Sequence, residues 1–157
     1  MKLAEALAER KTLANRFSTI EARLKNNARV QEGDAVREDP EKLFGLLEET
    51  AEALRDLMVR IARTNQATVV EGRSLVDWIA ERDVALRRFN LLSGVARKAS
   101  ERVERRNADD LRIVPVIDIV ARKHEADQLA ARVRGIDARI QAANWATELL
   151  GKRETMV

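Results

Sequence analysis

The chain of 157 residues has no cysteine and no tyrosine, and it contains only six glycines and two prolines. Without cysteine it cannot form disulfides, use a thiolate nucleophile or hold a zinc finger or an iron–sulfur cluster. Aromatic residues make up only 3% of the chain. This scarcity argues against a β-sandwich, and the low glycine count argues against a glycine-rich α/β fold. The lack of cysteine also fits a reducing compartment, so we expect a cytoplasmic protein.

Long apolar runs are missing as well. No stretch approaches the ~20 apolar residues that a membrane-spanning helix needs. Near the N-terminus, Glu5 and Glu9 stand where a signal peptide would have its apolar segment. We therefore expect a protein that is not exported, and a membrane is not an expected partner.

The residues that the chain does contain are typical of long helices. Hydrophobic residues make up 45% and charged residues 35%, and Ala, Glu, Arg and Leu dominate. The 29 basic and 26 acidic side chains leave a net charge of +3. A dedicated nucleic-acid-binding protein usually carries a stronger basic stripe, so we expect no nucleic-acid partner.

Four helices are predicted, at about residues 2–27, 40–65, 74–106 and 118–150. The second has the clearest start, because Asp39 can cap it and Pro40 suits its first position. The third opens with Ser74 and Asp77 at the spacing of a capping box. In the second, apolar residues and Thr recur every three or four positions: Leu43, Leu47, Thr50, Leu54, Leu57, Ile61 and Thr64. The apolar face of the third is formed by Leu75, Ile79, Leu86, Phe89, Ala96 and Val103.

Short extended segments are expected in the connections. Thr68–Val70 is rich in β-branched residues and precedes Glu71-Gly72, a pair that suits a turn. Residues 111–114 are also typical of a strand, and the predicted topology would let them pair with residues 30–31. The sequence therefore predicts two small extended regions within a helical protein.

These elements predict a mainly α fold with a single helical domain over residues 1–157. Two helical hairpins, with four long antiparallel helices in all, would form a coiled-coil-like bundle. Long helices with more than one apolar face usually bury the second face against a partner. We therefore expect a homo-oligomer, and the same faces would also accept another protein partner.

Few residues offer the chemistry of an enzyme. The one histidine, His124, lies on the fourth predicted helix without a Ser or Cys nucleophile motif near it, and we interpret it as an exposed helix residue. Position 121 is Ala, so the Glu-x-x-His motif of di-iron bundles is absent. No Walker or Gly-x-Gly-x-x-Gly loop occurs. We expect no catalytic residue, cofactor or metal ligand.

One polar group of residues has two interpretations. Arg63 and Asn65 end the second predicted helix, and Arg82 and Asp83 lie among apolar neighbours on the third. Polar groups at the depth of a helix seam are costly unless they are paired, so we favour buried pairs that fix the helix register. In the alternative, all four converge near one end of the bundle and bind a small anion.

The two tryptophans, Trp78 and Trp145, are the candidate core or interface anchors, because large aromatic side chains dominate the energetics of cores and interfaces. Trp145 would lie at the flank of the apolar face of the fourth helix. We expect its side chain to be mostly buried.

Several motifs resemble the septicolysin-like family of small bacterial helical proteins. These motifs, which run nearly end to end, are MKLAEAL at residues 1–7, VQEG at 30–33, RTN at 63–65, RD at 82–83 and NWATELL at 144–150. The resemblance implies a shared helical fold. The family label implies a pore-forming cytolysin, and no catalytic residues come with it.

We therefore predict a non-enzymatic, homo-oligomeric helical scaffold or interaction protein. The alternative, a membrane-active pore-forming protein, rests on the family label. A binder of small anions or nucleic acid is a third hypothesis.

Overall fold

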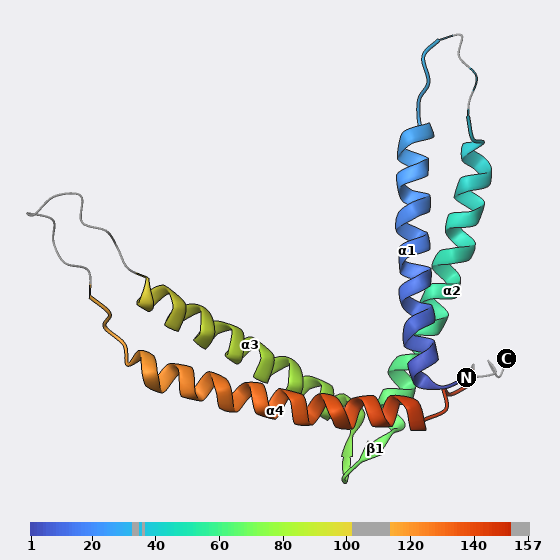
Figure 1. Ribbon diagram of the computed structural model, residues 1–157. Coiled ribbons are helices and arrows are strands. Elements are labelled where there is room, and N and C mark those ends of the chain that lie inside the picture. Colours follow the sequence, from blue (N-terminus) through green and yellow to red (C-terminus); the bar gives the residue numbers. More distant parts are fainter. Residues whose placement is uncertain (33–34, 36, 102–113, 152–157) are drawn as a thin grey trace, which may run out of the picture. The chain divides into compact units, whose positions relative to one another are not determined.

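All four predicted helices are present, so the prediction of a mainly α, four-helix fold is confirmed (Figure 1). The computed structural model describes residues 1–32, 35, 37–101 and 114–151. The helices are α1 (Leu3–Asn27), α2 (Pro40–Ala67), α3 (Leu75–Ser100) and α4 (Ile119–Ala146), and the strands are β1 (Val69–Val70) and β2 (Arg73–Ser74). The part of the third helix predicted over residues 102–106 lies outside the described residues.

The predicted domain of residues 1–157 packs as two compact units. The first unit comprises Met1–Val69 together with the chain from Ala143 onward, and the second comprises Val70–Ala142. The first contains the α1–α2 pair and the last turn of α4, and the second contains α3 and most of α4, so each predicted helical hairpin corresponds largely to one unit (Figure 1).

The helix-start signals act as predicted. The Asp39 side chain accepts a hydrogen bond from the backbone N–H of Glu41 at 3.0 Å, and Pro40 is the first residue of α2. At the start of α3, the Ser74 hydroxyl accepts from the N–H of Asp77 at 3.2 Å, and the Asp77 carboxylate accepts from the N–H of Ser74. Each cap provides a partner for backbone donors that would otherwise lack one.

The predicted turn at Glu71-Gly72 joins β1 to β2. Glu71 has φ of 50° and Gly72 has φ of 78°, so both central residues are left-handed, as a type I′ hairpin turn requires. Residues 30–31, which were expected to pair with residues 111–114, are described by the structure and form no strand. Most of that predicted partner, residues 111–113, lies outside the described residues.

The end of the fourth helix was predicted too far along the chain, near residue 150. Instead, residues 147–149 leave the helix and pair with the N-terminal backbone. The N–H of Leu3 donates to the carbonyl of Thr147, and the N–H of Leu149 donates to the carbonyl of Met1, both at 2.9 Å. These backbone hydrogen bonds between segments distant in the sequence end the helix before residue 150, although the helical periodicity continues to that residue.

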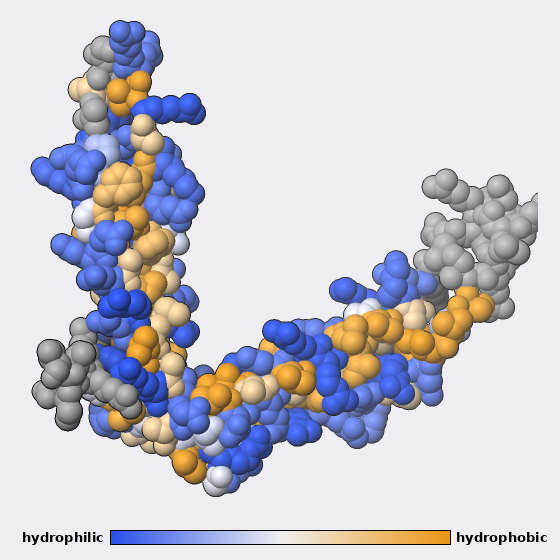
Figure 2. Space-filling view, turned by 180° about the vertical axis from the view of Figure 1, so that it is seen from behind, coloured by the Kyte–Doolittle hydropathy of each residue, from blue (hydrophilic) through white to orange (hydrophobic). Residues whose placement is uncertain are grey.

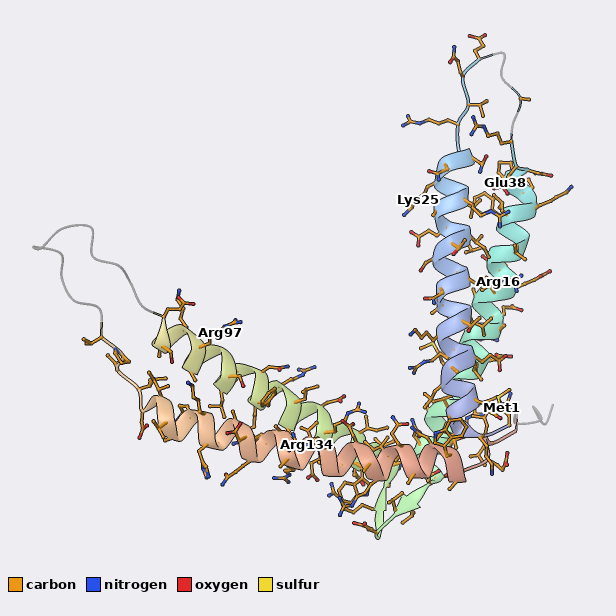
Figure 3. The ribbon with its side chains drawn as sticks, viewed as in Figure 1. Met1, Arg16, Lys25, Glu38, Arg97 and Arg134 are labelled. Atoms are coloured by element: carbon orange, nitrogen blue, oxygen red, sulfur yellow. The ribbon has the colours of Figure 1, made fainter. Side chains whose placement is uncertain are left out.

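The core of the first unit follows the predicted seam of α2. Its buried members are Leu3, Ala6 and Ile20 of α1 and Leu43, Thr50, Leu57, Ile61 and Thr64 of α2. Charged side chains of α1, such as Arg16 and Lys25, are exposed (Figure 3). This separation of faces is typical of a helix that packs on one side only.

Thr64 does more than fill the seam. It is 1% exposed, and its hydroxyl donates to the carbonyl of Arg60 at 2.8 Å. The same oxygen accepts from the N–H of Leu150 at 3.1 Å, and the Nε of Arg60 donates to the carbonyl of Leu150 at 2.9 Å. Thr64 therefore attaches the segment after α4 to α2.

The core of the second unit differs in part from the predicted face of α3. The buried residues are Leu75, Trp78, Ala85 and Ala96 of α3 with Ala126, Leu129, Ile136 and Ile140 of α4. Leu86 was predicted to lie on this face, but it is 41% exposed. Trp78 and Ala85 form the inward face of α3 instead, and Leu86 lies at the edge of that face.

We predict that Thr64→Val lowers the free energy of unfolding by about 1 kcal/mol more than Thr50→Val. Thr50 is equally buried, but its hydroxyl only donates to the carbonyl of Leu46 within its own helix. Thr64→Val additionally removes the acceptor of the Leu150 N–H, and a hydrogen bond of this kind contributes about 1 kcal/mol. Denaturant unfolding followed by circular dichroism measures both variants, and equal losses would contradict this role of Thr64.

Candidate functional site

The helix α3 carries a second line of apolar side chains. We call Val76, Val84, Leu91 and Val95 the outer stripe. They are separated by eight, seven and four residues, so at about 100° per residue they share one side of the helix. All four are exposed, Leu91 by 65% and Val84 by 59%. Apolar residues run along the α3–α4 pair in the space-filling view (Figure 2).

The outer stripe lies away from the buried face of α3. Trp78 and Ala85 point into the unit, and the helical spacing puts Val84 and Leu91 about 100–140° around the helix from them. Val84 still borders α4, because it lines a hollow together with Ala85 and with Leu129 of α4. Sequence analysis predicted additional apolar faces in general but did not identify these residues. The available signal was a second apolar periodicity in the same helix.

The charges along α3 change sign between its two halves. Residues 75–86 contain three acids, Asp77, Glu81 and Asp83, and one base, Arg82. Residues 87–100 contain four bases and no acid: Arg87, Arg88, Arg97 and Lys98. The outer stripe therefore has acidic neighbours in its first half and basic neighbours in its second.

The orientation of α3 is held by Trp78. Its side chain is 8% exposed, and its indole N–H donates to the carbonyl of Val70 in β1 at 2.9 Å. The guanidinium groups of Arg73 and Arg139 lie over the ring, 4.4 and 5.3 Å from its centroid. Both distances fit cation–π contacts. Trp78 is thus an anchor inside its own unit rather than an interface anchor.

Glu81 connects three elements of the second unit. Its carboxylate accepts from Arg73 of β2 and from Arg132 of α4, each at 2.7 Å. Hydrogen bonds from Arg73 first, and then from Arg132, lower the pKa of Glu81 below its ordinary value. The pair α3–α4 is further bridged by Arg88 and Glu125 at 3.0 Å.

The candidate polar cluster is divided between the units. Arg63, which is exposed, and Asn65, which is half-buried, belong to the first unit. Arg82 and Asp83 belong to the second, where Arg82 pairs with Asp83 at 2.7 Å and lies 3.7 Å from Asp137. We expected this pair to be buried at the helix seam, and that prediction is wrong, because the Asp83 side chain is 51% exposed. The pair lies at the edge of the packed face of α3.

Trp145 was expected to be mostly buried, and this prediction is wrong. Its side chain is 62% exposed, while its neighbours Ala143 and Asn144 are buried. The chain leaves the helix directly after Ala146, so Trp145 is near the helix end and its side chain is turned outward. It therefore does not belong to the core, and its role as an interface anchor stays a prediction.

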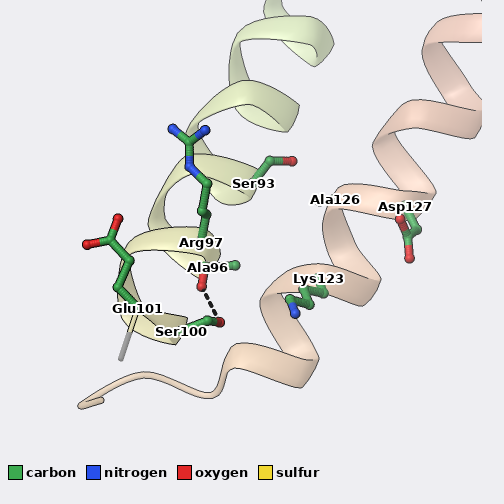
Figure 4. Close-up of a pocket in the computed structure, with 8 residues that line it drawn as sticks. All are labelled: Ser93, Ala96, Arg97, Ser100, Glu101, Lys123, Ala126 and Asp127. Atoms are coloured by element: carbon green, nitrogen blue, oxygen red, sulfur yellow. Dashed lines mark hydrogen bonds between the residues drawn. The ribbon is translucent and has the colours of Figure 1, made fainter. Parts of the chain in front are cut away.

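A hollow of about 560 Å³ lies between α3 and α4 at the end of α3 (Figure 4). The small side chains of Ala96 and Ala126 leave space there, and Ser93 points toward α4. Sequence analysis did not anticipate this hollow, although small residues on two facing helices are a signal for one. The remaining lining residues are Arg97, Ser100, Glu101, Lys123 and Asp127.

The charged residues that line this hollow are exposed. Glu101 pairs with Lys98 at 2.7 Å, and the Ser100 hydroxyl donates to the carbonyl of Ala96. No buried charged group within the described residues is aimed into the space, so we assign it no ligand. Across the described part of the chain, no three His, Cys, Asp or Glu side chains are grouped as a metal site requires. No described helix has an apolar stretch suited to crossing a membrane.

Comparisons with known proteins identify relatives whose function is unknown. Residues 2–149 match the model of a family described as "Family of unknown function (DUF6847)". The fold is similar to the crystal structure of a functionally unknown conserved protein from Corynebacterium diphtheriae, with a TM-score of 0.88 and 37% sequence identity. That match covers 96% of this chain and 99% of the other. No curated protein matches the chain.

The predicted resemblance to septicolysin-like proteins is therefore wrong. The family match extends over residues 2–149, which include nearly all the motifs on which the resemblance rested, and it indicates no septicolysin-like family. The pore-forming interpretation depended on that label and has no other basis.

We predict opposite results for the two tryptophans. Trp78→Ala should lower the free energy of unfolding by about 3–5 kcal/mol, because it empties a buried site. Trp145→Ala should change it by less than about 0.5 kcal/mol, as exposed substitutions do. Denaturant unfolding followed by circular dichroism gives both values, and a large loss in Trp145→Ala would restore it to the core.

We also predict that Glu81 makes stability depend on acid. Its pKa is lower in the folded protein than in the unfolded chain, so its contribution is present above its ordinary pKa and is lost as pH falls through the folded value. Glu81→Gln should therefore lower the melting temperature at pH 7 and reduce its further fall toward about pH 3. Glu48→Gln, at an exposed position of α2, is the control. Identical pH profiles for Glu81→Gln and the unaltered protein would contradict the prediction.

Proposed function

Because the chain belongs to the family of unknown function DUF6847, we propose a function from its own surfaces: it is a non-enzymatic helical scaffold that self-associates through the outer stripe of α3. The observation that carries this proposal is the exposure of Val76, Val84, Leu91 and Val95 along one side of a helix whose other side is already packed.

Burial of this stripe supplies the driving force. Removing apolar surface from water contributes roughly 25 cal/mol per Å². The outer stripe extends over the 20 residues from Val76 to Val95, which is roughly 28 Å of helix at 1.5 Å per residue. A continuous line of this length is typical of helix–helix interfaces, whereas scattered exposed apolar residues need no explanation.

A binding role also fits what the described residues offer. The exposed surface presents apolar side chains and paired charges, while the hollow between α3 and α4 has no buried charged group aimed into it. Enzymatic sites usually combine a pocket with titratable groups of perturbed pKa. We therefore propose an interaction protein, and a cytoplasmic location remains part of the proposal.

The proposal predicts the mass of the protein in solution. At about 10–50 µM, size exclusion coupled to light scattering should give at least twice the 17.7 kDa of one chain, because the exposed apolar stripe favours association. A species of 17.7 kDa alone would refute self-association.

A variant pair locates the interface on α3. Leu91→Glu should give a monomer with an unchanged circular dichroism spectrum, since it puts a charge in the centre of the outer stripe. Leu86→Glu introduces the same change at another exposed position of α3 outside the stripe, and it should keep the mass of the unaltered protein. Equal masses for the two variants would place any interface elsewhere.

A further inference from the structure

We infer that the partner on the outer stripe is a second copy of this chain, with the two α3 helices antiparallel about a two-fold axis near residues 85–86. This inference rests on the proposed self-association and adds its geometry. The two ends of the outer stripe are exchanged by this axis, because Val76 and Val95 lie at almost equal distances from it, while Val84 comes opposite Arg87. A two-fold interface requires such a self-complementary surface.

Side-chain sizes support this register. With the axis between residues 85 and 86, Leu91 of one copy lies opposite Ala80 of the other. Ala80 is exposed and lies on the same side of α3 as the outer stripe. A large side chain opposite a small one allows two helices to approach closely. A parallel arrangement would instead put Leu91 against Leu91 and Ala80 against Ala80, which crowds one level and leaves space at the other.

The distribution of charge supports the antiparallel direction. An antiparallel pair brings the acidic first half of each α3 against the basic second half of the other. Asp83 and Arg87 are four residues apart and lie along the same edge of the stripe. The two-fold axis preserves that edge, so Asp83 of one copy comes within about one residue of Arg87 of the other. A parallel pair would align like charges along the whole helix, which is unfavourable.

The electrostatic part is tested by reversing the charges. Asp83→Arg and Arg87→Asp should each weaken self-association by roughly tenfold, since each creates two like-charge contacts across the axis. The double variant should restore the affinity. Arg97→Asp, an exposed site of α3 away from the stripe, is the control for the change in net charge and should stay near the unaltered value. Failure of the double variant to recover would overturn the charge pairing.

The direction of the helices is tested by cross-linking, which is straightforward because the chain has no cysteine of its own. In the antiparallel pair, residue 80 of one copy meets residue 91 of the other, whereas two copies of either residue are separated by roughly 16 Å along the helix. A disulfide spans Cα atoms only about 4.4–6.8 Å apart. Ala80→Cys alone and Leu91→Cys alone should therefore not form disulfide-linked dimers, and an equal mixture should.

The outcomes separate the inference from the function on which it rests. Cross-linked dimers from the mixture only would support the antiparallel pair. Cross-linking of each single variant with itself would show a parallel pair, which overturns the inference and preserves self-association. A dimer by light scattering that is not cross-linked in any combination would place the interface away from α3. A monomeric unaltered protein would refute the proposed function itself.

Discussion

The indole of Trp78 is the contact on which the second unit depends. Its N–H binds the carbonyl of Val70, and guanidinium groups from β2 and α4 lie over its ring, so three elements meet on one side chain. Because these contacts fix the rotation of α3 about its own axis, the side of the helix opposite Trp78 must face outward. The exposure of Val84 and Leu91 therefore follows from how the core is anchored, and it is not an accident of the surface.

The sequence predicted well those features that depend on neighbouring residues. The cap at Asp39, the capping box at Ser74 and the turn at Glu71-Gly72 each need only a few adjacent positions, and all three are present. The predictions failed where distant segments decide the outcome. Helical periodicity carries the fourth helix to residue 150, but backbone pairing between residues 147–149 and the N-terminal residues ends it earlier. The outward orientation of Trp145, next to that helix end, was missed for the same reason.

The mistaken resemblance has a similar origin. Some of the motifs that suggested it lie at helix ends, where the backbone groups of almost any helical hairpin need partners. Thr64 illustrates this, since its hydroxyl bonds both Arg60 and Leu150 and so serves the packing of the first unit. Residues with such structural roles recur wherever the same local arrangement occurs. They are therefore weak indicators of family and carry no information about activity.

The position of Arg87 bears on how specific the outer stripe is. It lies along the edge of the stripe, between the levels of Val84 and Leu91, and puts a charge beside the apolar line. A stripe without this charge would accept many apolar surfaces, and the charge makes most of them unfavourable, because the cation would be buried without a partner. A second copy in the antiparallel direction supplies that partner through Asp83. The same residue therefore reduces non-specific association and selects one direction, as polar residues within coiled-coil seams do.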